Sequence, residues 1–195
     1  MKTILITGFE PFDHDLVNPS WQAVSALPDE INGVCLIKKE IPVVFDQAPG
    51  QIKELMDQYD PDLVICTGYN AKARELNLEY AALNLKHARI ADNAGNQPQQ
   101  QPIAIDGPLA LESRLPVFEL EKMLNQKKIS AKVSFSAGTY VCNDVMYEVV
   151  KACQEREIPG GFIHIPPFSQ EPKSGMPFEN VRAGLVKVVE FLTAS

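Results

Sequence analysis

The stretch Lys132–Cys153, KVSFSAGTYVCNDVMYEVVKAC, contains the pattern that decides the fold. It opens with a short run ending at Ser136, passes a glycine and continues with apolar residues spaced as on one face of a helix. These apolar residues are Val145, Met146, Val149, Val150 and Cys153. The pattern predicts a strand over 132–136, a turn and then an amphipathic helix. Strands that alternate with helices are typical of α/β proteins.

The same alternation continues on both sides of this stretch. Short apolar runs predict strands over 3–7, 34–40, 63–66, 76–82 and 161–165. Helical spacing predicts helices after the N-cap residues Asn18 and Asp46, around 116–127 and over 178–192. We therefore expect an α/β fold: a three-layer αβα single domain over residues 1–195, with a mostly parallel central sheet and helices on both faces. The polar stretch 91–108 is too long for an ordinary connection and is typical of a functional or disordered loop.

Composition excludes several classes of protein. The 195 residues carry a net charge of −7, so the basic surface of a nucleic-acid-binding protein is not expected. No apolar run approaches the roughly 18 residues of a membrane-spanning helix. The apolar start at residues 3–7 is too short for a secretory signal, and we expect neither export nor membrane insertion. Four scattered cysteines without a CxxC pair, and histidines without metal-ligand spacing, predict no structural metal and a reduced, cytoplasmic location.

One of the four cysteines differs from the others. Cys35, Cys66 and Cys153 lie in apolar patterns and are expected to be small buried side chains. Cys142 lies at the expected start of a helix, where unpaired N–H groups and the helix dipole favour a thiolate. The same N–H groups could bind an oxyanion. On position alone Cys142 is either a nucleophile or a buried thiol at a helix start.

Two other side chains could complete a site with Cys142. His164 lies near the carboxyl end of a predicted strand, where α/β proteins place their sites, although it could also be a core histidine. Glu79 lies between Leu78 and Tyr80, and it is either exposed on an edge strand or buried with a partner such as histidine. A thiol, an imidazole and an orienting carboxylate form a generalised catalytic triad. His14 and His87, in polar surroundings, are expected to be solvated.

Five segments together resemble the cytosolic type I pyroglutamyl peptidases along nearly the whole chain. They are Ile4–Phe12 (ILITGFEPF), Asn18–Ser20 (NPS), Ala88–Pro98 (ARIADNAGNQP), Ser136–Asn143 (SAGTYVCN) and Gly160–Pro166 (GGFIHIP). The resemblance implies that Cys142 is the nucleophile, His164 the general base and Glu79 the third catalytic residue. It also implies that Phe9 and Phe12 enclose the pyroglutamyl ring, that Asn18 anchors a loop, and that Arg89 lies near the active site.

Two segments depart from that family's usual pattern. The family usually has Gly-Gln or Gly-Leu followed by Ala-Gly-Gly-Arg after its third main strand. This chain has Gly68 followed by the changed segment Tyr69–Arg74 (YNAKAR) at that place. The first loop has Asp13-His14-Asp15 in place of paired glycines. Neither departure touches the three expected catalytic residues. Both lie near the expected substrate pocket, and Tyr69 is therefore counted among the expected substrate-binding residues.

The resemblance implies a cysteine exopeptidase that removes an N-terminal pyroglutamyl residue from peptides. It implies no metal and no organic cofactor, and it implies a homo-oligomer, commonly a tetramer. Two alternatives remain open on the sequence. One is a related thiol hydrolase, an amidase or esterase with another acyl preference, which the changed segment Tyr69–Arg74 would favour. The other is a non-catalytic α/β binding protein.

Overall fold

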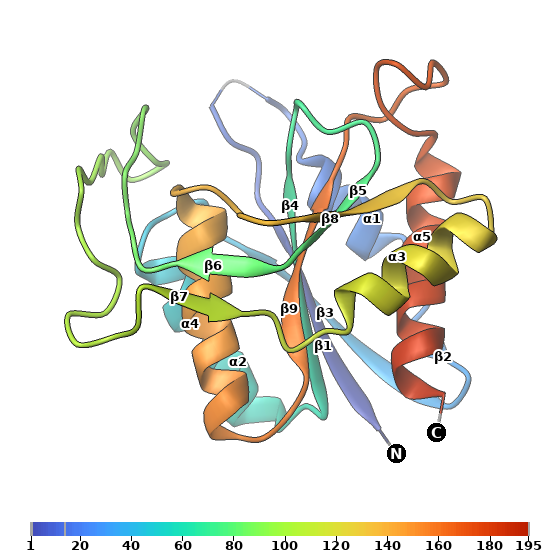
Figure 1. Ribbon diagram of the computed structural model, residues 1–195, viewed down its shortest axis with the longest axis horizontal. Helices are drawn as coiled ribbons and strands as arrows, with labels where there is room; N and C mark the ends of the chain where they lie inside the picture. The colour runs from blue at the N-terminus through green and yellow to red at the C-terminus, as the bar shows by residue number, and fades with distance from the viewer. Residues whose placement is uncertain (1, 14, 195) are drawn as a thin grey trace.

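A seven-stranded sheet forms the centre of the computed structural model, which describes residues 2–13 and 15–194 (Figure 1). Its strand order is β2-β3-β1-β4-β9-β5-β8, and β6 and β7 form a separate pair. The strands are β1 (Thr3–Phe9), β2 (Glu30–Ile31), β3 (Val34–Ile41), β4 (Leu63–Tyr69), β5 (Leu76–Glu79), β6 (Ala81–Leu83), β7 (Ala110–Glu112), β8 (Ala131–Ser134) and β9 (Gly160–Ile165). The helices are α1 (Pro19–Ser25), α2 (Gln47–Tyr59), α3 (Val117–Gln126), α4 (Val141–Glu155) and α5 (Phe178–Thr193). No helix in the described ranges is long and apolar enough to cross a membrane.

Each face of the sheet has its own apolar core. Because side chains alternate along a strand, Ile4 and Ile6 of β1 pack into one core and Leu5 packs into the other. The first core also takes residues from α1, α3 and α5, and the second takes residues from α2 and α4. Figure 1 shows these two groups of helices on opposite sides of the sheet. The predicted three-layer α/β arrangement is confirmed.

The sheet is parallel over β3, β1, β4 and β9, and it changes direction beside β9. β5 runs antiparallel to β9 and parallel to the edge strand β8, while β2 is antiparallel to β3 at the other edge. The last strand in the sequence, β9, thus lies between β4 and β5. This change of direction places residues of β5 opposite the carboxyl end of β9.

The single strand predicted over 76–82 is two strands. β5 ends at Glu79, and β6 pairs with β7 in the small sheet, which Figure 1 shows across α4. Tyr80 makes the change, because its N–H donates to the Ser134 carbonyl while its own carbonyl accepts from Ser113 N. The short strands β2 and β7 were not predicted, since two or three residues carry too little pattern.

The two predicted N-caps behave differently. Asn18 caps α1 as expected, because its Oδ1 accepts from Ser20 N at 3.0 Å and Pro19 follows it. Asp46 occupies the N-cap position of α2, but its side chain makes no capping hydrogen bond. Its φ of 60° turns the carboxylate towards Lys86 instead. Asp46 therefore marks the start of the helix without capping it.

Candidate active site

Cys142 is the second residue of α4, at the end of the sheet where β4 and β9 finish. Its side chain is partly exposed, and Tyr140 at the N-cap position makes no side-chain capping bond. The start of α4 therefore lies at the thiol without a side-chain cap. Gly68 of β4 leaves room for the sulfur: a Cβ at Gly68 would lie 2.8 Å from Cys142 Sγ.

His164 lies beside that thiol on β9. It pairs in register with Gly68, and the residue is 6% exposed. The ring centroid is 4.9 Å from that of Phe162, and the imidazole makes a hydrogen bond with the Cys142 side chain. His164 is therefore a buried imidazole in contact with a partly exposed thiol, and not a solvated or purely structural histidine.

Glu79 is buried against the other side of the imidazole. It is 1% exposed, and its Oε1 lies 2.7 Å from His164 Nδ1. Burial alone would lower the pKa of His164, but hydrogen bonds to Cys142 and to Glu79 outweigh it and raise that pKa to about 10. With Nδ1 bonded to Glu79, Nε2 is the ring nitrogen left for the thiol. The structure thus brings Glu79, His164 and Cys142 together in one line of contacts.

A small pocket and a larger cleft meet at Cys142. The pocket has a volume of about 150 Å³ and the cleft one of about 510 Å³. Both are lined by Phe12, Tyr69, Tyr140 and Cys142. Phe9, Asp15, Asn18, Val43 and Val141 complete the pocket among the described residues. Phe9, Phe12 and Tyr69, expected to bind the substrate, thus all line the small pocket, and their role in binding stays a prediction.

Arg89 is exposed and lines the larger cleft, and it does not line the small pocket. Asn18, expected to anchor a loop, donates from Nδ2 to the Glu10 carbonyl at 3.0 Å and so holds the loop after β1. The changed segment contributes Tyr69, Asn70, Ala71 and Lys72 to the cleft. The changed segment therefore lies at the cleft that also contains Cys142, while its effect on the substrate stays a prediction.

Sequence reasoning missed Tyr140 as part of the pocket. Its ring lies 5.5 Å from that of Phe12 and 5.2 Å from that of Phe45, measured between centroids. Its hydroxyl donates to the Ala91 carbonyl at 2.9 Å. The only signal for Tyr140 in the sequence is its position two residues before Cys142. Asp15 was missed as well.

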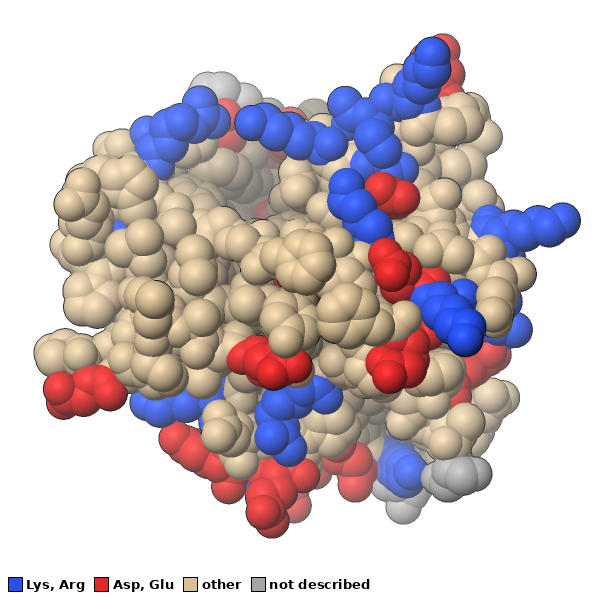
Figure 2. Space-filling model, viewed as in Figure 1, with Lys and Arg blue, Asp and Glu red and all other residues tan. Residues whose placement is uncertain are grey.

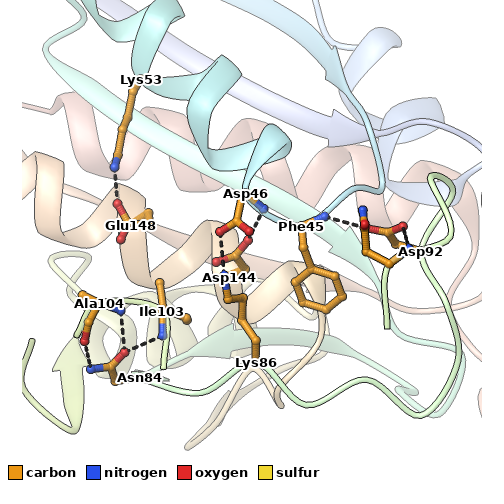
Figure 3. A network of polar contacts seen from close by, with 11 residues as sticks. Phe45, Asp46, Lys53, Asn84, Lys86, Asp92, Ile103, Ala104, Asp144 and Glu148 are labelled. Carbon is orange, nitrogen blue, oxygen red and sulfur yellow. Dashed lines mark hydrogen bonds and ion pairs between the residues drawn. The ribbon is translucent and has the colours of Figure 1, made fainter. Parts of the chain in front are cut away.

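The first turn of α4 is fixed by polar contacts (Figure 3). Asp144 is fully buried, and its Oδ2 accepts from Asp46 N at 2.8 Å. Asp46 in turn pairs with Lys86 Nζ at 2.6 Å. Burial raises the pKa of Asp144 to about 6. Asn143, also buried, accepts from Leu83 N and donates to the Leu83 carbonyl, both at 2.8 Å. These contacts hold the helix turn that carries Cys142.

The polar stretch 91–108 is tied to the rest of the molecule at two places in Figure 3. Asp92 accepts from Phe45 N at 2.9 Å, and Asn84 Oδ1 accepts from the N–H groups of Ile103 and Ala104 at 2.8 Å. A bridge between Lys86 and Gln101 adds a third contact. The stretch therefore forms an ordered wall next to the segment 84–89.

The other cysteines and His87 are not part of this line of contacts. Cys66 and Cys153 are buried as expected, and burial raises the pKa of each thiol to about 12. Cys35 is only partly buried, which corrects the expectation for that residue, because it lies on β3 next to the edge strand β2. His87 is exposed at the cleft, and His14 lies outside the described residues.

Among residues 2–13 and 15–194 there is no group of three or more His, Cys, Asp or Glu side chains that could hold a metal ion.

An α/β fold that presents a thiol at a helix start, a buried imidazole and a carboxylate on that imidazole has the arrangement of a cysteine hydrolase. A family model describing pyroglutamyl peptidases matches residues 2–186. The chain belongs to the pyroglutamyl peptidase family.

Individual relatives agree with this assignment. A pyrrolidone-carboxylate peptidase of Thermosipho melanesiensis is 41% identical over 165 residues, which cover 84% of this chain and 82% of the relative. A pyrrolidone-carboxylate peptidase of Bacillus cereus is 38% identical over 202 residues, which cover 99% of this chain and 94% of the relative. The crystal structure of pyroglutamyl peptidase I from Bacillus amyloliquefaciens is 34% identical and covers 99% of this chain and 95% of its own, with a TM-score of 0.92. The structure of pyrrolidone carboxyl peptidase from Thermococcus litoralis is 32% identical and also has a TM-score of 0.92. The match covers 97% of this chain and 92% of that chain.

Proposed function

We propose that this protein is a cysteine exopeptidase that hydrolyses the bond after an N-terminal pyroglutamyl residue and releases free pyroglutamate. The observation that carries the proposal is the line of contacts from Glu79 through His164 to Cys142, with 2.7 Å between Glu79 Oε1 and His164 Nδ1. It stands at the mouth of a small pocket walled by aromatic side chains. Membership of the pyroglutamyl peptidase family supports the choice of acyl group.

In this reaction the Cys142 thiolate attacks the carbonyl that joins pyroglutamate to the next residue. His164 holds the proton of the thiol, and the N–H groups at the start of α4 stabilise the tetrahedral oxyanion. His164 Nε2 then gives its proton to the leaving amine. Water, deprotonated by the same nitrogen, hydrolyses the thioester and restores the thiol. Glu79 accepts from Nδ1, which fixes the ring tautomer and stabilises the imidazolium.

The small pocket supports a neutral acyl ring. Phe9, Phe12 and Val43 supply apolar surface, and Tyr69 and Tyr140 close it near the thiol. Burying a charged amine among such side chains costs free energy that a lactam avoids. Asp15, the acidic residue in the described lining, is exposed and stands at its edge.

The experiment compares aminomethylcoumarin amides of pyroglutamate, proline and N-acetylalanine. Proline has the same ring size but carries a charged amine and no ring carbonyl. We expect kcat/KM for the pyroglutamyl amide to exceed that of the other two by about 100-fold, because the apolar pocket would have to bury the charged amine of proline and would be left unfilled by the open-chain acetylalanine. Faster turnover of another acyl group would instead assign the triad to a different thiol hydrolase, and no turnover would leave a binding protein.

We further propose that residues 1–195 act as one catalytic domain in the cytoplasm and assemble as a homotetramer. The match of the family over residues 2–186 supports the single domain, and the described cysteines, all free, suit a reduced compartment. Exposed apolar side chains such as Leu16, Ile105 and Leu109 are compatible with association. Light scattering should give a mass about four times the 21.6 kDa of the chain, and a value equal to one chain would reject the tetramer.

A further inference from the structure

The cleft beyond Cys142 has a different character from the small pocket. In the proposed reaction the pocket holds the acyl ring, so the leaving peptide must occupy the larger cleft, which meets the pocket at the thiol. Two cationic side chains, Lys72 and Arg89, line that cleft, and neither lines the pocket. His87 lies beside them. The surface that meets the leaving peptide therefore carries positive charge.

Within the part of the chain that the structure describes, this positive charge has no ion-pair partner. Among the described residues Glu79 is the one acidic side chain in the cleft lining, and it is buried and bonded to His164. Within residues 2–13 and 15–194 neither Lys72 nor Arg89 forms an ion pair, whereas Asp15 belongs to the acyl pocket. Figure 2 shows Lys and Arg side chains along the upper rim of the hollow. A chain with a net charge of −7 thus presents cationic side chains at this cleft.

Lys72 lies on the β4–β5 loop, inside the segment that departs from the usual family pattern. The neighbouring Arg74 donates to the Ala73 carbonyl at 2.9 Å and the Ala71 carbonyl at 3.4 Å, so its guanidinium braces the loop from within. The exposed Lys72 ammonium is left to face the cleft. The loop therefore supplies a cation where the leaving peptide passes.

We propose that this cleft selects peptides with an acidic side chain, aspartate or glutamate, within the first two residues after the pyroglutamyl group. The proposal rests on the proposed peptidase function and adds the class of leaving peptide to it. An exposed ion pair favours binding by about two- to fivefold, so we expect kcat/KM to be about fivefold higher for glutamate than for its neutral isostere glutamine. The preference should act mainly through KM, because the contact forms before bond cleavage and persists through it.

The test uses four amidated peptides, so that no terminal carboxylate competes: pGlu-Ala-Ala, pGlu-Glu-Ala, pGlu-Gln-Ala and pGlu-Ala-Glu. Release of the free amine is measured at low salt and at about 0.5 M NaCl, where the Debye length is well under about 10 Å and exposed charges are screened. We expect the better of the two glutamate peptides to exceed the glutamine peptide about fivefold at low salt and to lose most of that advantage at high salt.

Variants assign the preference to Lys72. Lys72→Gln should reduce the glutamate-to-glutamine ratio of kcat/KM to about half or less, and Lys72→Glu should reverse the preference. The matched control is Lys122→Gln, since Lys122 is an exposed lysine on α3 that does not line the cleft. The control should keep the parent ratio.

Each outcome decides between the two proposals. Turnover of pGlu-Ala-Ala with a glutamate-to-glutamine ratio near one would overturn the acidic preference and leave the peptidase function intact. A ratio that Lys72→Gln and Lys122→Gln change equally would also overturn it, because the charge of the cleft would not be the cause. Failure to cleave any pyroglutamyl peptide would reject both the function and the preference that rests on it.

Discussion

Replacing Glu79 with glutamine tests the triad through its positioning residue. Glu79 is 1% exposed and lies 2.7 Å from His164 Nδ1, so glutamine keeps the volume but removes the buried negative charge. Burial alone would lower the pKa of His164, and the contact with Glu79 is one of the two hydrogen bonds that raise it to about 10. In Glu79→Gln that pKa should fall, and the glutamine NH₂ group also favours the wrong ring tautomer.

The expected size of the effect follows from the contact that is lost. A hydrogen bond to a charged group is worth about 1.5–3 kcal/mol, which corresponds to about 10- to 150-fold in rate. A misplaced tautomer adds to this, and loss of the carboxylate in a serine triad costs up to about 10⁴-fold. A thiol is intrinsically more nucleophilic than a hydroxyl and should suffer less. We therefore expect kcat to fall about 10- to 1,000-fold.

The raised pKa of His164 also makes the unfolding free energy of the protein depend on pH. Because the folded pKa of His164 lies above its ordinary value of 6.5, the pair stabilises the fold fully below pH 6.5 and loses this effect as pH rises through about 10. In Glu79→Gln the decline in unfolding free energy over that window should be smaller. The triad therefore predicts a change in both kcat and the alkaline stability profile.

The assay measures three quantities: kcat for a pyroglutamyl fluorogenic amide, the rate of alkylation by iodoacetamide at pH 7, and the urea midpoint at several pH values. The control is Glu155→Gln, an exposed carboxylate at the far end of the helix that carries Cys142. Unchanged kcat together with an unchanged alkylation rate in Glu79→Gln would remove Glu79 from the mechanism. Cys142 and His164 would then act as a dyad.

Three further perturbations test the surroundings of the thiol. Gly68→Ala places a methyl group 2.8 Å from Cys142 Sγ and should lower kcat about 100-fold, whereas Gly50→Ala, with open space around it, should not change kcat. Cys142→Ser should leave a folded protein with background turnover. Cys153→Ser should lower the free energy of unfolding in urea by about 1–3 kcal/mol while keeping kcat per folded molecule. If the two phenotypes are reversed, Cys142 is not the nucleophile. Burial raises the pKa of Asp144 from 3.8 to about 6, so its contribution to stability is present below pH 3.8 and is lost as pH rises through 6. Between pH 3.8 and pH 6 the unfolding free energy of the parent should fall by up to about 3 kcal/mol more than that of Asp144→Asn. If the unfolding free energies of the two proteins change with pH in the same way, Asp144 does not carry a buried charge.

Local pattern predicted most of the fold. The strands and helices around Cys142 and His164 follow from apolar spacing within a few residues, and the α4 helix begins one residue before the thiol. The boundaries of other elements moved by one to three residues, because helix and strand ends depend on tertiary contacts.

The parts that could not be predicted depend on pairing over long distances. Glu79 meets His164 because β5 runs opposite to β9, and the two residues are 85 positions apart in the sequence. Nothing in the alternation of 76–82 indicates that direction, or the exit of the chain from the sheet at Tyr80. The packing of Tyr140 between Phe12 and Phe45 is likewise a property of the folded chain.

The position of β9 has a consequence for how the protein is made. Without β9 the sheet consists of two unconnected parts, β2-β3-β1-β4 and β5-β8. A ribosome therefore completes almost five-sixths of the chain before the strand that joins them emerges, and that strand also brings His164. During synthesis, enzymatic activity should appear only after β9 has joined the two parts of the sheet, when α1 to α4 have already been made and α5 is still to follow.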